Sequence, residues 1–124
     1  AIKRTDPHLV LVALTGSPLI DQARAEGLAV VAEAFADRAY TSKGELVSRR
    51  EKGAVLHDPA HVAERMLKLV STGFVTSIDG VETRVDAQSI CVHGDSPGAV
   101  AMARRLRELF EQSGLAIRPF SPAV

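Results

Sequence analysis

The chain has 124 residues, of which 46% are hydrophobic, and fifteen lysines and arginines balance fifteen aspartates and glutamates at a formal net charge of zero. The length is about that of one domain, and the charge balance excludes a strongly basic protein that recruits nucleic acid or an anionic membrane, so a small ligand or a protein partner is expected. The single cysteine excludes an internal disulfide framework. We find no signal-like or long apolar segment, so a cytoplasmic location is expected.

The first third of the chain predicts a strand–helix–strand unit. Leu9 to Leu14 is a continuous apolar run, and a helix is predicted from its Ser17 cap to about Glu26, with Gly27 as the stop. A second β-like run, Leu28 to Phe35, follows and contains Glu33. Apolar strands that alternate with helices indicate parallel pairing under a cover of helices.

The middle of the chain predicts a loop followed by a helix. Residues 41–56 look irregular, carry several basic side chains and have few apolar anchors, so we expect a mobile segment that acts as a lid. Asp58 and Pro59 then begin a helix that continues to about Ser71 and buries one apolar face.

A hairpin is predicted next. The runs Phe74 to Ile78 and Val81 to Val85 flank Asp79-Gly80, a dipeptide typical of a two-residue type I′ turn. We interpret residues 74–85 as an insertion into a single partial domain that spans residues 1–124.

The segment from residue 89 to 98 is the strongest functional signal. Residues 89–93 read as a core strand that ends in a polar, Gly-rich turn containing His93 and Asp95. Ser96 is predicted as the N-cap of a helix that begins at Pro97 and runs to about Gln112, so the turn is expected to offer free backbone N–H groups to an anion. Leu115 to Arg118 is predicted to be a short last strand.

Three apolar strands of core quality are found, over residues 9–14, 28–35 and 89–93. An open Rossmann-type sheet and a β/α barrel both fit this alternation, but three strands are too few to close a barrel. The segment Ala1 to Pro7 looks like the tail of a helix and its stop. We therefore expect an α/β fold that is incomplete on its own, leaving a free sheet edge for a companion segment or a second copy.

Several ordered motifs together resemble the LamB/YcsF family of 5-oxoprolinase A subunits. They are Glu33–Tyr40, Gly44–Val47, Ser77-Ile78, Cys91–Asp95 and Ala103–Arg107. The resemblance spans essentially the whole chain, but it covers only the C-terminal part of the family domain.

This resemblance implies the C-terminal portion of a distorted, deacetylase-like β/α barrel whose N-terminal part lies elsewhere. It also implies the ATP-dependent hydrolysis of 5-oxo-L-proline to L-glutamate, carried out with partner subunits B and C. The expected cofactors are ATP and a divalent cation such as Mg²⁺, although the sequence has no P-loop and no complete metal site.

Four polar residues at strand ends are candidate site residues, and each has a structural alternative. We expect His93 to act as a general acid or base and Asp95 to orient it or bind a cation; alternatively, both only brace the turn. Asp37 is a candidate catalytic carboxylate, and Arg38 suits the carboxylate of 5-oxoproline or a phosphate. The alternative for these two is a structural ion pair.

Two further side chains lie on predicted strands. Glu33 shares a face with Val31 and Phe35, so its carboxylate must be paired or protonated. Two interpretations of Glu33 remain: it forms a salt bridge, for instance to Arg38, or it is a substrate-binding or catalytic carboxylate. Cys91 shares a face with His93, but a lone cysteine in an apolar strand is typical of packing rather than of a nucleophile.

Three functions remain possible. The chain is a catalytic part of a lactam hydrolase that binds 5-oxoproline at these strand ends, or it is a non-catalytic module that binds and passes on an intermediate. The third, a metal-dependent deacetylase-like hydrolase, rests on analogy between folds.

Overall fold

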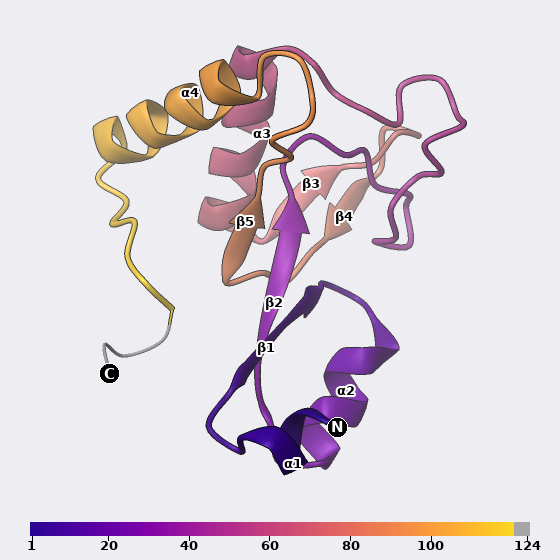
Figure 1. Ribbon diagram of the computed structural model, residues 1–124. Helices are drawn as coiled ribbons and strands as arrows, with labels where there is room; N and C mark the ends of the chain where they lie inside the picture. The colour runs from indigo at the N-terminus through magenta and orange to yellow at the C-terminus, as the bar shows by residue number, and fades with distance from the viewer. Residues whose placement is uncertain (121–124) are drawn as a thin grey trace.

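The computed structural model describes residues 1–120 of the chain (Figure 1). Its elements follow in chain order: α1 (Ile2–Thr5), β1 (Val10–Leu14), α2 (Pro18–Ala25), β2 (Ala29–Phe35), α3 (Pro59–Thr72), β3 (Phe74–Thr76), β4 (Glu82–Arg84), β5 (Ser89–Cys91) and α4 (Ala99–Gln112). None of these helices is both long and apolar enough to cross a membrane.

The central element is a parallel sheet with the strand order β1-β2-β5. The predicted α/β fold with parallel strands is therefore confirmed. The sheet has three strands and does not close on itself within residues 1–120, as expected for a fold that is incomplete as a barrel.

Helices α2 and α3 begin where the sequence predicts caps. The Ser17 hydroxyl accepts a hydrogen bond from the Leu19 N–H at 3.2 Å, and the Asp58 carboxylate accepts one from the Ala60 N–H at 3.0 Å. Such caps typically contribute about 1 kcal/mol each to helix stability. At the end of α3, Gly73 has a φ of 80°, the left-handed conformation that stops a helix with little strain.

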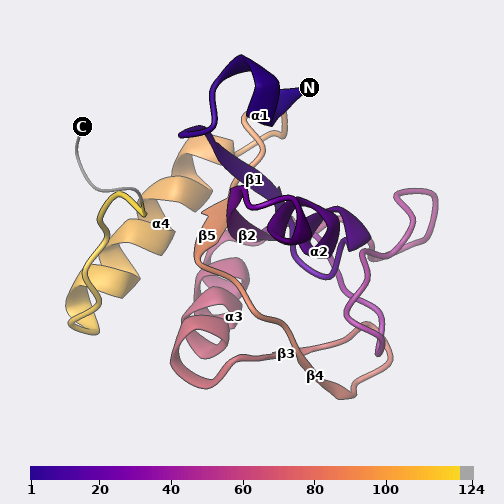
Figure 2. The ribbon, with the colours of Figure 1, turned by 90° about the horizontal axis from the view of Figure 1, so that it is seen from below.

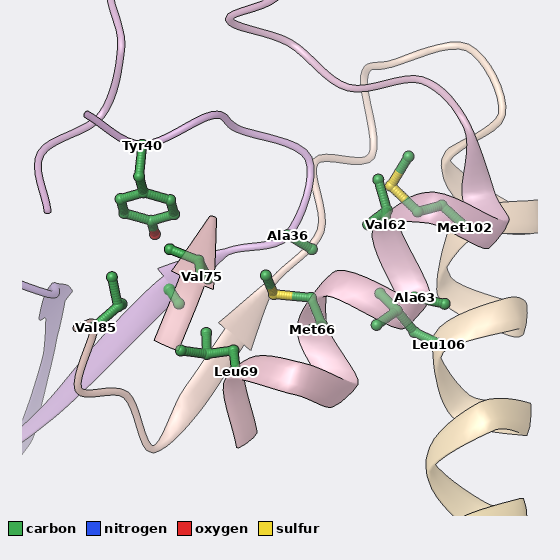
Figure 3. Close-up of a cluster of buried hydrophobic side chains, with 11 residues drawn as sticks. Ala36, Tyr40, Val62, Ala63, Met66, Leu69, Val75, Val85, Met102 and Leu106 are labelled. Atoms are coloured by element: carbon green, nitrogen blue, oxygen red, sulfur yellow. The ribbon is translucent and has the colours of Figure 1, made fainter. Parts of the chain in front are cut away.

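One face of the sheet carries the core. Val30, Ala32 and Ala34 of β2 point to this face. Together with their neighbours on β1 and β5, they pack against α2, α3 and α4. Figure 2 shows α2, α3 and the hairpin on the same side of the sheet. Figure 3 shows the larger cluster, in which side chains of α3, α4 and the hairpin meet Ala36 and Tyr40.

The other face, called here the second face, contributes no residue to these clusters within residues 1–120. Strand register and alternation assign to it Val10, Val12, Leu14, Ala29, Val31, Glu33, Phe35, Ser89 and Cys91. Val12 is 39% exposed. Val31, which pairs with Val12 on this face, is buried. At the carboxyl ends of the strands, Glu33, Phe35 and Cys91 are half-buried, so the face is partly accessible there.

The hairpin forms at the predicted position, but its turn is of another type. Asp79 cannot have the positive φ that a type I′ turn requires, because no residue other than glycine has one in the described chain. Instead the Gly80 N–H bonds to the Ser77 oxygen at 2.9 Å, and Gly80 has a φ of 80°. The hairpin loop therefore has three residues, 78–80, and of these only Gly80 has the left-handed conformation.

The start of α4 also differs from the prediction. The helix begins at Ala99, and its N-cap is Gly98 with a φ of 78°, not Ser96. Pro97 lies in the preceding turn, in which the Ala99 N–H bonds to the Ser96 oxygen at 3.2 Å. The left-handed glycine interrupts the chain after Pro97, so the helix cannot start earlier.

The predicted last strand, Leu115 to Arg118, is wrong. No strand is present there, because a strand requires a neighbouring backbone to bond with. The Leu115 N–H bonds back to the Phe110 oxygen at the end of α4 instead. The segment lines a cavity of about 480 Å³ between the tail, α4 and β5.

Candidate functional site

The site is centred on a side-chain hydrogen bond between His93 and Asp37, which lie at two neighbouring strand ends. Nδ1 of His93 lies 2.6 Å from Oδ1 of Asp37. The Asp37 side chain is 3% exposed and that of His93 is 20% exposed. The carboxylate is therefore nearly closed off from solvent, while the imidazole remains reachable.

The sheet topology explains how two distant residues meet. Asp37 follows the end of β2, and His93 follows the end of β5. These strands are parallel neighbours, with Phe35 opposite Cys91, so their carboxyl ends lie at the same edge of the sheet. A hydrogen bond of 2.9 Å from the Ala36 N–H to the Cys91 oxygen continues the pairing one step further.

The pairing determines what His93 can do. When Nδ1 carries the proton and donates a hydrogen bond to Asp37, Nε2 keeps a free lone pair and can accept a proton from a reacting group. A buried carboxylate at Nδ1 also stabilises the imidazolium that forms. The His93 and Phe35 rings make an edge-to-face contact, with 4.8 Å between their centroids and an angle of 80° between their planes. This contact places the imidazole on the side of the second face.

Next to the Asp37–His93 pair, the second face carries two further polar groups. The Ser89 hydroxyl donates to the Glu33 carboxylate at 2.7 Å. Glu33 makes no ion pair within residues 1–120, so the predicted salt bridge to Arg38 is absent. Burial, and then the carboxylates of Glu33 and Asp37, raise the pKa of the Cys91 thiol. This shift disfavours a thiolate nucleophile at neutral pH.

The carboxylate hydrogen-bonded to His93 Nδ1 is that of Asp37, and no hydrogen bond joins Asp95 to His93 within residues 1–120. Asp95 is exposed in the turn before α4 and makes no side-chain hydrogen bond or ion pair in the part of the chain described. It is therefore free to meet a substrate or a partner. The predicted anion site at Ser96 and Pro97 does not form as expected, since the helix begins beyond them.

Arg38 points into the loop of residues 41–56. It is 7% exposed, and its Nη2 donates to the Val47 backbone oxygen at 2.6 Å. No ion pair joins it to Asp37 within residues 1–120. Ala39, Val47 and Ala54 form a small buried cluster, so the loop is better anchored than its composition suggested. This placement favours a scaffold role for Arg38.

Two pairings escaped the sequence analysis: His93 with Asp37, and Glu33 with Ser89. Each joins residues 56 positions apart. The signal that could have found them is the parallel pairing itself, because polar residues at matched positions of neighbouring strands must be adjacent. Two cavities, of about 480 and 420 Å³, lie elsewhere, and neither is lined by His93 or Asp37.

Comparison with known proteins finds close similarity along the whole sequence. The chain matches the LamB/YcsF family over residues 1–124. It is 63% identical to a 5-oxoprolinase A subunit of Pseudomonas syringae pv. tomato, over 98% of this chain and 47% of that protein. It is 64% identical to the 5-oxoprolinase A subunit of Paracidovorax citrulli, over 98% of this chain and 48% of that protein.

A solved structure is similar as well. The lactam utilization protein of Thermus thermophilus superimposes with a TM-score of 0.90 and 42% identity, over 96% of this chain and 47% of that one. The chain thus spans about half the length of the curated relatives and of the solved structure that it matches.

Proposed function

This chain belongs to the LamB/YcsF family, and we propose that it forms the C-terminal part of the A subunit of a 5-oxoprolinase. In this role it takes part in the ATP-dependent opening of 5-oxo-L-proline to L-glutamate. The observation that carries the proposal is the identity of more than 60% to two A subunits over nearly the whole chain. The buried Asp37–His93 pair supplies a group suited to the hydrolytic step.

The reaction requires a base at a defined place. The lactam of 5-oxoproline is a resonance-stabilised amide that water attacks poorly. Transfer of the γ-phosphoryl group of ATP to the amide oxygen, with release of ADP, makes the ring carbon open to water. The carbon–nitrogen bond then breaks, the nitrogen takes up a proton, and phosphate leaves as the carboxylate of L-glutamate forms. We assign to His93 the removal of a proton from that water through Nε2, and to Asp37 the orientation of the ring. We assign substrate binding to Glu33 and Asp95. Glu33 is hydrogen-bonded to Ser89 on the second face, and Asp95 is exposed.

ATP and its cation do not fit the described residues alone. Asp37 is nearly buried and committed to His93, and residues 1–120 contain no group of three or more His, Cys, Asp or Glu side chains placed to hold a metal. We therefore propose that nucleotide and cation are held largely by subunits B and C together with the N-terminal part of this A subunit.

The test is reconstitution. The chain is combined with subunits B and C together with the complementary part of the A subunit, and ATP hydrolysis is measured with and without 5-oxo-L-proline. We expect hydrolysis that depends on 5-oxo-L-proline and disappears when this chain is omitted. Equal turnover without the chain would show that it is not part of the catalytic assembly. Hydrolysis that survives His93→Ala would instead favour a module that only binds and transfers an intermediate.

A further inference from the structure

Arg65 of α3 is a buried cation that the site above does not use. The residue is 9% exposed, and within residues 1–120 it makes no ion pair with a carboxylate. Its Nη1 donates to the Ala36 backbone oxygen at 3.2 Å, and its Cζ lies 5.4 Å from the centre of the Tyr40 ring. Burial lowers the pKa of Arg65, which reflects the cost of removing its charge from water.

Tyr40 is its partner in this contact. The residue is fully buried, and its hydroxyl accepts a hydrogen bond from the Phe35 N–H at 2.9 Å. Burial raises the pKa of Tyr40, so the hydroxyl remains neutral at physiological pH. In Figure 3 the hydroxyl end of the ring points toward Val75 and the buried cluster.

These two side chains bind backbone groups of the two consecutive residues just before Asp37. Tyr40 binds the N–H of Phe35, and Arg65 binds the oxygen of Ala36. The backbone oxygen of Asp37 accepts a bond from the Leu56 N–H at 2.8 Å. The end of β2 is therefore fixed on the side of the core, so that the Asp37 carboxylate emerges at one defined place beside β5.

The energetic balance indicates that stability is not the reason for an arginine here. A buried guanidinium without a carboxylate partner carries a desolvation cost, and a well-packed apolar side chain of similar length often stabilises a core as well or better. The charge does provide a strong donor to the Ala36 oxygen and an attraction to the Tyr40 ring.

We propose that Arg65, supported by Tyr40, is a positioning residue that holds Asp37 in place to orient His93. The proposal rests on the proposed function of His93 as a base. Arg65 acts only through the backbone of Ala36, and it contacts neither substrate nor the reacting atoms.

The test uses ¹⁵N-labelled histidine in the full chain, because the nitrogen shifts of His93 report whether Nδ1 or Nε2 carries the proton. We expect the Nδ1–H form to predominate in the unaltered protein and to be largely lost in Arg65→Met. In Arg65→Lys it should be mostly kept, because the lysine ammonium can still donate to the Ala36 oxygen. Turnover of the reconstituted enzyme should fall at least about tenfold in Arg65→Met, as expected when a catalytic group is misplaced.

The matched control is Lys68→Met, one turn further along the same helix. Lys68 is paired with Glu82 at the surface, so its loss should leave the His93 signal unchanged. Circular dichroism checks folding, and if Arg65→Met does not fold, Tyr40→Phe tests the same support and should show the same loss of the Nδ1–H form. An unaltered His93 signal in every folded Arg65 and Tyr40 variant would overturn the proposal. Because this signal requires no turnover, an inactive assembly with an intact His93 signal would count against the proposed function and not against the positioning role.

Discussion

Asp37 and His93 lie 56 positions apart in the chain, yet Oδ1 of one is 2.6 Å from Nδ1 of the other. Each follows a strand that pairs in parallel with the other's strand. The pair therefore depends on the sheet and not on any local turn, which distinguishes it from a contact that merely stabilises the loop after β5.

The first prediction concerns this pair. His93→Ala and Asp37→Asn should each lower 5-oxoproline-dependent ATP hydrolysis about a hundredfold, the usual scale for loss of a general acid or base. The double variant should be little worse than either single variant, because the two residues act as one unit. Steady-state kinetics of the reconstituted enzyme gives the measurement. Near-normal turnover in a folded His93→Ala variant would remove the pair from the mechanism.

Asp95→Asn is the informative comparison, since Asp95 is exposed and makes no hydrogen bond or ion pair with His93. We expect this change to lower turnover through substrate contact while leaving the His93 proton on Nδ1. If Asp95→Asn shifts the proton to Nε2, the assignment of orientation to Asp37 alone is contradicted.

Local signals predicted the elements well and their partners poorly. The helix α3 lies where Asp58, Pro59 and the apolar spacing place it, because cap and periodicity are encoded within a few residues. Proximity in sequence predicts that Asp95 orients His93 or binds a cation, whereas the carboxylate bonded to Nδ1 is that of Asp37, whose position depends on strand register. Register is set by the burial of whole strands, which no short motif contains.

Backbone geometry accounts for the other differences. Glycine took the left-handed position both in the hairpin, at Gly80, and before α4, at Gly98, so neither Asp79 nor Ser96 plays its predicted part. The tail from Leu115 to Arg118 has strand-like composition, yet composition does not provide a neighbouring strand.

The second prediction concerns the reactivity of Cys91. Its pKa is raised, first by burial and then by Glu33 and Asp37, so less thiolate is present at a given pH than for a free cysteine, whose pKa is about 8.5. At pH 8, iodoacetamide should therefore alkylate Cys91 more slowly than it alkylates a cysteine peptide. The alkylation rate of Cys91 should increase at a higher pH than the rate of the peptide does. Cys91→Ala should keep near-normal turnover. Rapid alkylation at pH 7, together with loss of turnover in Cys91→Ala, would revive the nucleophile hypothesis.

The third prediction concerns association through the second face. The unclosed sheet should bind the complementary part of the subunit, or a second copy in its absence, and Val12→Lys should weaken this association because a buried lysine would lack a partner. Val100→Lys is the control, since Val100 is 74% exposed on α4. Sedimentation velocity compares the two. A monodisperse monomer that also fails to bind the complementary part would show that the face is not an interface.

The fourth prediction separates the two roles considered for Arg38. Its bond to the Val47 oxygen anchors the loop of residues 41–56, so Arg38→Lys should speed amide exchange in that loop and destabilise the fold by about 1–2 kcal/mol. The KM for 5-oxo-L-proline should change less than about threefold, because a buried guanidinium bound to backbone is not free to bind a carboxylate. Hydrogen exchange and denaturant unfolding measure the structural effect, and kinetics measures the KM. A KM raised tenfold or more, with exchange in the loop unaltered, would instead return Arg38 to the substrate site, since only a group that touches the substrate weakens its binding without loosening the fold.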